Sequence, residues 1–258
     1  MTDPTRLSLN LITVDHWSLP EAVERCAAAG VGWVAPWRHQ YEDAAEAARI
    51  IRDAGLAVSS LCRGGFFTAD GAREDNRRAV EEATALGAPV LVLVCGPPNG
   101  RDLHAARATI AAGIEELLPY AKEHGVRLGI EPLHPMMIGE RSAISSLAEA
   151  LTLARTFGDP GVGVVIDAYH VFWDARLEDE LAAAHGLVAG YHVSDWLVPT
   201  PDLLAGRGLM GDGIIDLPHI RALVDATGYD GPVEVEVINP ALATETILDD
   251  IVARFAQC

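Results

Sequence analysis

Four polar residues end apolar segments in the second half of the chain, and together they could bind a metal ion. Glu131 follows VRLGI, Asp167 follows VGVVI, His192 follows LVAGY, and Glu236 lies near the end of PVEVEV. Three carboxylates and one imidazole are hard to borderline ligands, which suit Mn²⁺, Mg²⁺, Co²⁺ or Zn²⁺. Crowded carboxylates raise one another's pKa unless a cation neutralises them. The pattern therefore predicts one divalent metal ion, with Mn²⁺ favoured.

The last of these segments contains two glutamates, Glu234 and Glu236, on one face of a predicted strand. Side chains alternate along a strand with a period of two, so both point the same way. Glu236 is nearer the carboxyl end and is interpreted as the ligand. Glu234 is interpreted as a deeper residue that needs a buried basic or hydrogen-bonding partner. A single acidic residue could instead cap a helix or pair with an arginine, but four at corresponding positions favour a metal site.

The elements that must position these residues follow a repeat of strand, loop and helix, with a period of about thirty residues. The chain of 258 residues is typical in length of one eight-fold barrel. We predict an α/β fold, a (β/α)8 TIM barrel that forms a single domain over residues 1–258. Side chains at the carboxyl ends of its strands would meet at one rim. The predicted strands are 7–12, 32–36, 57–62, 89–95, 126–131, 162–167, 187–192 and 232–237.

Helices are predicted between these strands, including 19–29, 42–54, 104–123 and 144–157. Glycines stand where left-handed caps would end helices, at positions 30, 55, 87, 125, 158 and 228. An open, doubly wound sheet is the competing architecture, but the segment after the first strand, TVDHWS, lacks its glycine-rich turn. One long connection, 193–215, is predicted to be a lid or binding loop.

Composition limits the partners of the protein. Lys and Arg total 19 against 37 Asp and Glu, for a net charge of −18, which disfavours nucleic acid. No apolar run approaches the roughly 20 residues of a membrane span, and the first residues do not resemble a signal peptide. The cysteines at 26, 62, 95 and 258 form no C-x-x-C pair. We expect a cytoplasmic enzyme without membrane association; the oligomeric state, including a homo-oligomer, is left open.

Five stretches of the sequence, taken in order, resemble those of a known family. The ordered stretches IEPLHP (130–135), VVIDAYH (164–170), YHVSD (191–195), RGLMGDGIID (207–216) and GYDGPVEVE (228–236) are similar to those of the xylose isomerase-like TIM-barrel superfamily. Within it, the chain looks like the short bacterial proteins named sugar phosphate isomerases or epimerases. The resemblance runs nearly end to end. It implies that Glu131, Asp167, His192 and Glu236 bind the metal, and that His170 and Arg207 contact the substrate.

The resemblance also implies a mechanism that the residue types can support. A metal-bound carbonyl would acidify the neighbouring C–H, because the cation stabilises the enediolate that forms. Glu131 and Glu236 would be the catalytic pair, one removing the proton and the other returning it. His170 and Arg207 could hold the substrate oxygens, although His170 could equally be a structural histidine and Arg207 a solvated loop residue.

Aromatic and basic residues beside the predicted strand ends fit a small carbohydrate substrate. Flat apolar rings suit the C–H face of a sugar. His134, Arg38 and Arg63 are further candidate contacts at the tops of strands. Each of these residues taken singly could serve packing alone. The aromatic candidates are Trp17, Trp37, Trp173 and Trp196, with Phe66 and Phe67 after the third strand.

The function predicted is a metal-dependent isomerase or epimerase of a keto-sugar or related polyol-derived substrate. A lyase, dehydratase or hydratase that acts on a keto-sugar or keto-inositol uses the same C–H acidification and is the main alternative. A zinc-cluster endonuclease of this fold would need extra histidines after the early strands and a basic face. A non-catalytic sugar-binding barrel would not need two facing glutamates. The segment PLHPMMIGER after the first ligand and the hydrophobic loop after His192 depart from the ketose 3-epimerases, which leaves the substrate open.

Overall fold

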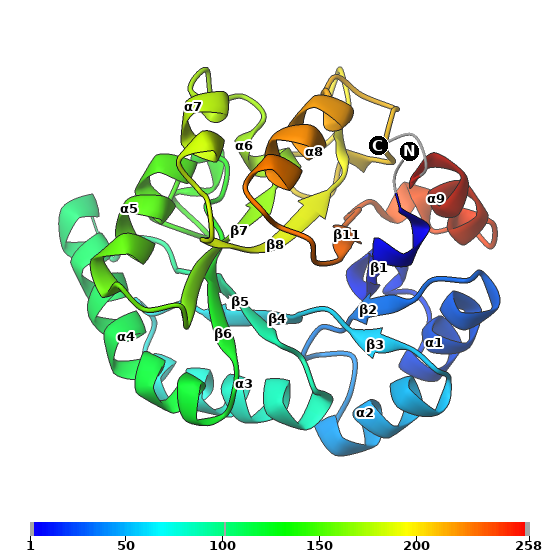
Figure 1. The fold of residues 1–258 in the computed structure, drawn as a ribbon, viewed down its shortest axis with the longest axis horizontal. Coiled ribbons are helices and arrows are strands. Elements are labelled where there is room, and N and C mark those ends of the chain that lie inside the picture. Colours follow the sequence, from blue (N-terminus) through cyan, green and yellow to red (C-terminus); the bar gives the residue numbers. More distant parts are fainter. Residues whose placement is uncertain (1–2, 101, 256–258) are drawn as a thin grey trace.

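A computed structural model describes residues 3–100 and 102–255 of the chain. Its main sheet is parallel, with strand order β3-β2-β1-β11-β8-β7-β6-β5-β4, and it curls into a nearly closed barrel (Figure 1). The predicted TIM barrel in a single domain is confirmed. The strands are β1 (Leu7–Asn10), β2 (Trp33–Ala35), β3 (Ala57–Val58), β4 (Leu61–Gly65), β5 (Val90–Val94), β6 (Arg127–Ile130), β7 (Val162–Asp167), β8 (Val188–Val193) and β11 (Val233–Val235).

The third predicted strand, 57–62, is broken in two, which is why the main sheet has nine strands rather than eight. β3 pairs with β2, whereas β4 pairs with β5, and Ser59 and Ser60 lie in the break. An isolated parallel bridge between Trp37, which follows β2, and Cys62 in β4 spans the break. The barrel is therefore nearly closed.

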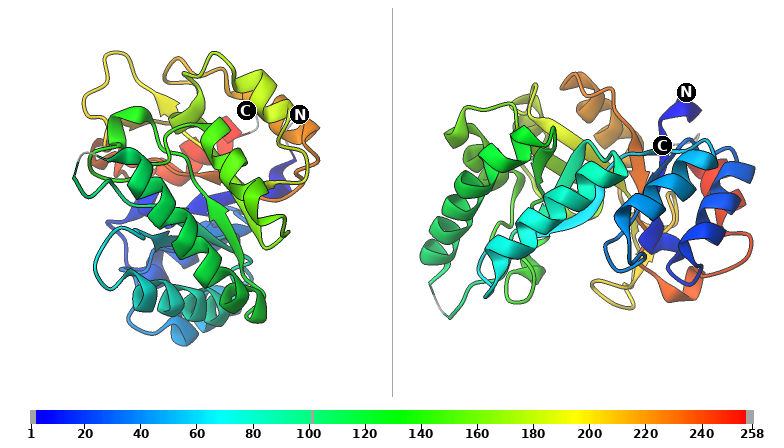
Figure 2. Two further views of the ribbon diagram at one scale, coloured as in Figure 1. Left: turned by 90° about the vertical axis from the view of Figure 1, so that its left-hand side faces the viewer. Right: turned by 90° about the horizontal axis from the view of Figure 1, so that it is seen from below.

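Helices surround the barrel, and the side views show them as an outer layer (Figure 2). The six predicted glycine caps all have positive φ, between 57° and 87°, as a left-handed helix end requires. The helices are α1 (Leu19–Ala28), α2 (Ala44–Asp53), α3 (Ala72–Leu86), α4 (Leu103–Glu123), α5 (Leu147–Phe157), α6 (Ala168–Val171), α7 (Leu177–Ala182), α8 (Leu217–Ala226) and α9 (Ile247–Phe255), with 3₁₀ turns η1 (Pro4–Arg6), η2 (Leu11–Val14), η3 (Pro135–Met137) and η4 (Pro240–Leu242).

Several predicted strands are shorter than expected, among them the first and the last. The first, 7–12, ends at Asn10 because the Asn10 side chain accepts a hydrogen bond from the Ile12 amide and begins the turn η2. The last, 232–237, pairs only over β11, so Glu236 lies just beyond it. Such ends bring polar side chains to the rim instead of continuing the ladder.

The apolar core has two parts that the barrel separates, and a third small cluster lies above the site. A large cluster fills the space between strands and helices, and a small cluster of Cys62, Val90, Val92, Val165 and Ala189 fills the inside of the barrel. The cysteines at 26, 62 and 95 are buried free thiols, and Cys258 lies outside the described residues. Among the described residues, none of the helices has the length and apolarity to cross a membrane.

Candidate metal centre and substrate cavity

The four predicted metal ligands converge at the carboxyl ends of four consecutive strands of the barrel. Glu131 follows β6, Asp167 ends β7, His192 lies in β8, and Glu236 follows β11. Each offers one ligand atom, and these atoms all lie within 4.8 Å of one another. All four side chains are buried. Parallel strands end at a common rim, and this brings residues separated by a hundred positions into one group.

The geometry of His192 fits a cation at this point. Its Nδ1 lies 3.5 Å from Glu131 Oε1 and 3.5 Å from Glu236 Oε2. Among the described residues this nitrogen is buried without a hydrogen-bond partner. A buried polar atom without a partner is costly, and a divalent ion would satisfy it together with the carboxylates. The donor set therefore suits the predicted metal.

Burial and like charge shift the acid–base behaviour of the group. Burial raises the pKa of Glu131 and takes that of Asp167 to about 7. Burial opposes the charged form of His192, yet the carboxylates of Glu234, Glu131 and Glu236 raise its pKa well above the usual range. The cluster thus carries excess negative charge that a cation would stabilise.

Arg207 supplies a positive charge beside the ligands. Its Nη1 donates to Asp167 Oδ2 at 2.9 Å and to Glu236 Oε2 at 3.0 Å. Its Nη2 lies 3.1 Å from His170 Nε2. A guanidinium can only donate, so this imidazole nitrogen accepts. Burial, followed by the charge of Arg207, lowers the pKa of His170 well below its usual range.

Arg207 reaches the site because the long predicted loop contains a small hairpin. β9 (Asp195–Trp196) pairs antiparallel with β10 (Arg207–Gly208). The carboxylate of Asp195 accepts hydrogen bonds from the amides of Trp196, Gly211, Gly213 and Ile215, at 2.8 to 3.0 Å. The segment 193–215 is therefore a structured element whose two ends are held together by one buried carboxylate.

Glu234 lies behind His192, and the structure confirms that it has buried partners. Its Oε1 is 3.4 Å from Nε2 of His192 and accepts from Asn10 Nδ2 at 2.7 Å. The hydroxyls of Ser59 and Ser60 both donate to Oε2 at 2.9 Å. Sequence reasoning missed these three donors. Polar residues within the otherwise apolar segments LSLNLI and AVSSLC were the available signal.

A small cavity of about 40 Å³ lies over the cluster. A volume of this size holds one or two waters rather than a sugar. Leu203 and Leu204, between β9 and β10, pack on Val94, Leu133 and Met137 above the site. The predicted residues Glu131, Glu236, Trp37, Arg63, His170 and Arg207 all line the cavity. A substrate therefore needs this part of the hairpin to move away.

Other predicted substrate contacts lie elsewhere. Arg38 points at α3, where it pairs with Asp75 at 3.0 Å and Glu82 at 2.9 Å. Trp17 is buried in the outer core beneath the guanidinium of Arg25, which stands 4.4 Å from its ring. The structure does not support a substrate contact for either residue.

His134 and Trp196 stand beside the cavity without lining it. Their rings stack on each other with centroids 5.2 Å apart, and Trp196 also stacks on Tyr169 at 4.8 Å. Trp173 meets the edge of His134. Sequence reasoning missed Arg141, which lines the cavity from the loop after β6. Arg141 belongs to the segment PLHPMMIGER, which departs from the pattern of the ketose 3-epimerases.

The chain is similar to several known proteins. Residues 23–258 match a family model described as a xylose isomerase-like TIM barrel. A crystal structure of a protein from Sinorhizobium meliloti 1021 is 42% identical, covers 99% of each chain and has a TM-score of 0.94. More distant are a 3-dehydroshikimate dehydratase of Pseudomonas putida, 25% identical over 86% of this chain, and an L-ribulose-5-phosphate 3-epimerase of Salmonella paratyphi C, 24% identical over 80%. This chain spans 36% of the dehydratase and 75% of the epimerase.

Proposed function

Because the chain belongs to the xylose isomerase-like TIM-barrel family, we propose that it is a divalent-metal-dependent isomerase or epimerase of a keto-sugar or related polyol-derived substrate. One observation carries the proposal: four potential ligand atoms converge within 4.8 Å, and two of the residues, Glu131 and Glu236, also line the cavity. The relative named as a ribulose-5-phosphate 3-epimerase supports this reaction class.

Glu131, Asp167, His192 and Glu236 would hold the ion, and their ligand types favour Mn²⁺, with Mg²⁺, Co²⁺ or Zn²⁺ as alternatives. The bound ion supplies positive charge that makes a C–H beside a carbonyl more acidic. The protein supplies the groups that move the proton and hold the oxygens.

Glu131 follows β6 and Glu236 follows β11, and β7 and β8 lie between these two strands. Both carboxylates lie 3.5 Å from Nδ1 of His192. One carboxylate takes the proton from the carbon beside the carbonyl. The other returns a proton to the opposite face of that carbon in an epimerisation. In an isomerisation the proton goes to the former carbonyl carbon, and the hydroxyl proton moves from one oxygen to the other. Arg207 and His170 would orient the substrate oxygens, because both line the cavity and are joined at 3.1 Å.

A dehydration is the second candidate, and the relative named as a dehydratase favours it. The same first proton transfer would precede loss of a hydroxyl group from the next carbon. A group that can donate a proton to that leaving hydroxyl is then needed. Glu131 or Glu236 would fill this role after it has accepted the first proton.

The test is a screen of ketoses and keto-inositols in D₂O with Mn²⁺, followed by proton NMR. An isomerase or epimerase places deuterium on the carbon beside the carbonyl while the substrate keeps its water. A dehydratase gives a product that has lost water. Deuterium uptake that Glu236→Gln leaves intact would overturn the assignment of Glu236.

The matched control is Glu178→Gln, because Glu178 is an exposed glutamate on α7 that pairs with His219 far from the cluster. We expect this variant to keep wild-type kcat. Circular dichroism should show the same fold for both variants.

The buried free thiols at positions 26, 62 and 95 support the predicted cytoplasmic location, and fractionation of the producing cells tests it.

A further inference from the structure

Side chains of both charges line the substrate cavity. Glu131 and Glu236 line it from the ends of β6 and β11, whereas Arg63 lines it from β4 and Arg141 from the loop that follows β6. Both arginines are partly buried. Within residues 3–100 and 102–255, neither guanidinium forms an ion pair or a hydrogen bond. The guanidinium of Arg63 lies over the Phe66 ring, 3.9 Å from its centroid. The cavity thus presents two arginines without a carboxylate partner.

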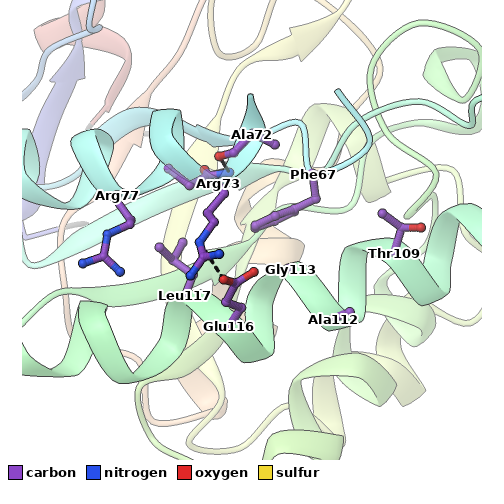
Figure 3. Close-up of a pocket in the computed structure, with 10 residues that line it drawn as sticks. Phe67, Ala72, Arg73, Arg77, Thr109, Ala112, Gly113, Glu116 and Leu117 are labelled. Atoms are coloured by element: carbon purple, nitrogen blue, oxygen red, sulfur yellow. Dashed lines mark hydrogen bonds and ion pairs between the residues drawn. The ribbon is translucent and has the colours of Figure 1, made fainter. Parts of the chain in front are cut away.

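Such arginines stand out in a chain that has almost twice as many acidic as basic residues, 37 against 19. Arg38 engages two carboxylates of α3. The groove between α3 and α4, about 340 Å³, gives a direct comparison (Figure 3). There Arg73 pairs with Glu116 at 2.7 Å and Arg77 lies over the Tyr120 ring. Among the described arginines that line this groove, Arg77 alone has no carboxylate partner, whereas the cavity has two such arginines.

The backbone holds both cavity arginines in place. Arg63 belongs to β4, at the carboxyl end of the barrel. The amide of Arg141 donates to Met137 O at 2.8 Å, and its carbonyl oxygen accepts from the amide of Gly96 at 3.0 Å, which ties the loop after β6 to the end of β5. Neighbouring strand ends therefore present both guanidinia to the same space before any ligand arrives.

The two positive charges repel each other. Burial, followed by the charge of Arg141, lowers the pKa of Arg63. An anion between them would stabilise both, and guanidinium groups bind phosphate and carboxylate through paired, charge-assisted hydrogen bonds. The carboxylates of Glu131 and Glu236 would repel such an anion, so the ligand has one favourable orientation.

We propose that Arg63 and Arg141 bind an anionic group of the substrate, a phosphate or a carboxylate, at the end away from the carbon that loses its proton. This inference rests on the proposed function, because it assumes that the reacting carbon lies beside Glu131 and Glu236. It assigns the substrate to the acidic carbohydrates and related keto-acids rather than to neutral sugars. It also gives Arg141 a role in selecting the substrate.

The test compares ligands that differ in one charge, by calorimetric titration of the Mn²⁺-loaded protein. The phosphate pair is L-ribulose 5-phosphate and L-ribulose, and the carboxylate pair is 3-dehydroshikimate and its methyl ester. We expect one charged ligand to bind at least about tenfold more tightly than its neutral counterpart, as charge-assisted hydrogen bonds would give. The pair that shows this ratio identifies the anion.

Arg63→Gln and Arg141→Gln should each reduce that ratio to about two or less while the affinity for the neutral ligand stays within about twofold. Arg63→Lys should restore part of the ratio because it keeps the charge. The matched control is Arg52→Gln, because Arg52 is exposed on α2 and far in the fold from the cavity lining. Circular dichroism and melting temperature report whether each variant folds.

Equal affinities for charged and neutral ligands in the wild type would overturn the inference, as would a ratio that survives both glutamine substitutions. Failure to bind any of the four ligands counts against it in the same way. Failure of the proposed function looks different. In that case the charged ligand binds with the expected ratio, and Arg63→Gln removes it, but no ligand takes up deuterium or loses water.

Discussion

Glu234→Gln tests how the protein prepares His192 to bind a metal ion. The carboxylate of Glu234 faces Nε2 of His192 at 3.4 Å and is itself held by Asn10, Ser59 and Ser60. A carboxylate at Nε2 favours the tautomer that keeps hydrogen there and leaves the lone pair on Nδ1, toward the other carboxylates. The amide of glutamine has the same size but no charge.

The size of the effect follows from this geometry. For a charged imidazole, two unit charges 3.4 Å apart attract by about 5 kcal/mol at an effective dielectric constant of about 20. A metal-bound imidazole is neutral and an amide oxygen can still accept the Nε2 hydrogen, so only part of that attraction is lost. Outer partners of this kind contribute about 10- to 100-fold to metal affinity, which is about 1.4 to 2.7 kcal/mol.

We therefore expect Glu234→Gln to bind Mn²⁺ about 10- to 100-fold more weakly in calorimetric titration. In the metal-free protein, where the neighbouring carboxylates raise the pKa of His192 well above its usual range, a ¹⁵N NMR titration of the imidazole should show a lower pKa in the variant than in wild type. Ser60→Ala is the matched control, because it removes one donor to Glu234 but leaves the charge, and it should weaken binding by less than about tenfold. Metal affinity within twofold of wild type, with an unchanged pKa of His192, would refute this account of Glu234.

Three further predictions concern pH, the hairpin and the fold. Burial raises the pKa of Asp167 to about 7, so below that pH a proton competes with the ion for this carboxylate. Calorimetric titration should show that Mn²⁺ affinity falls by about tenfold or more from pH 8 to pH 6. Equal affinities at the two pH values would contradict this prediction. Because Leu203 and Leu204 close a cavity too small for a sugar, amides in 197–206 should exchange hydrogen faster without ligand than with it; equal exchange rates would show that this segment does not open. Asp195→Ala should lower the free energy of unfolding by about 3 kcal/mol, since four backbone amides lose a charged acceptor. In urea denaturation, a loss below about 1 kcal/mol, no larger than that of Asp202→Ala at the exposed tip, would count against this role.

The repeating pattern of the sequence was enough to predict the barrel and the rim that carries the four potential ligands. Strand periodicity and glycine caps are local properties, and parallel strands in a barrel end at one rim whatever their other contacts. The broken third strand was not predictable in this way. Ser59 and Ser60 interrupt it where they bind Glu234, and Glu234 is 175 positions from Ser59.

The sequence by itself determined which residue types reach the rim and, through their order, that Glu131, Asp167, His192 and Glu236 meet. Only the tertiary structure decided the direction of side chains in the loops. It turned Arg38 toward the carboxylates of α3, buried Trp17 in the outer core, and left Arg141 facing the cavity. The physical reason is that a strand end has two faces set by alternation, whereas a loop side chain goes where distant charges and apolar surfaces attract it.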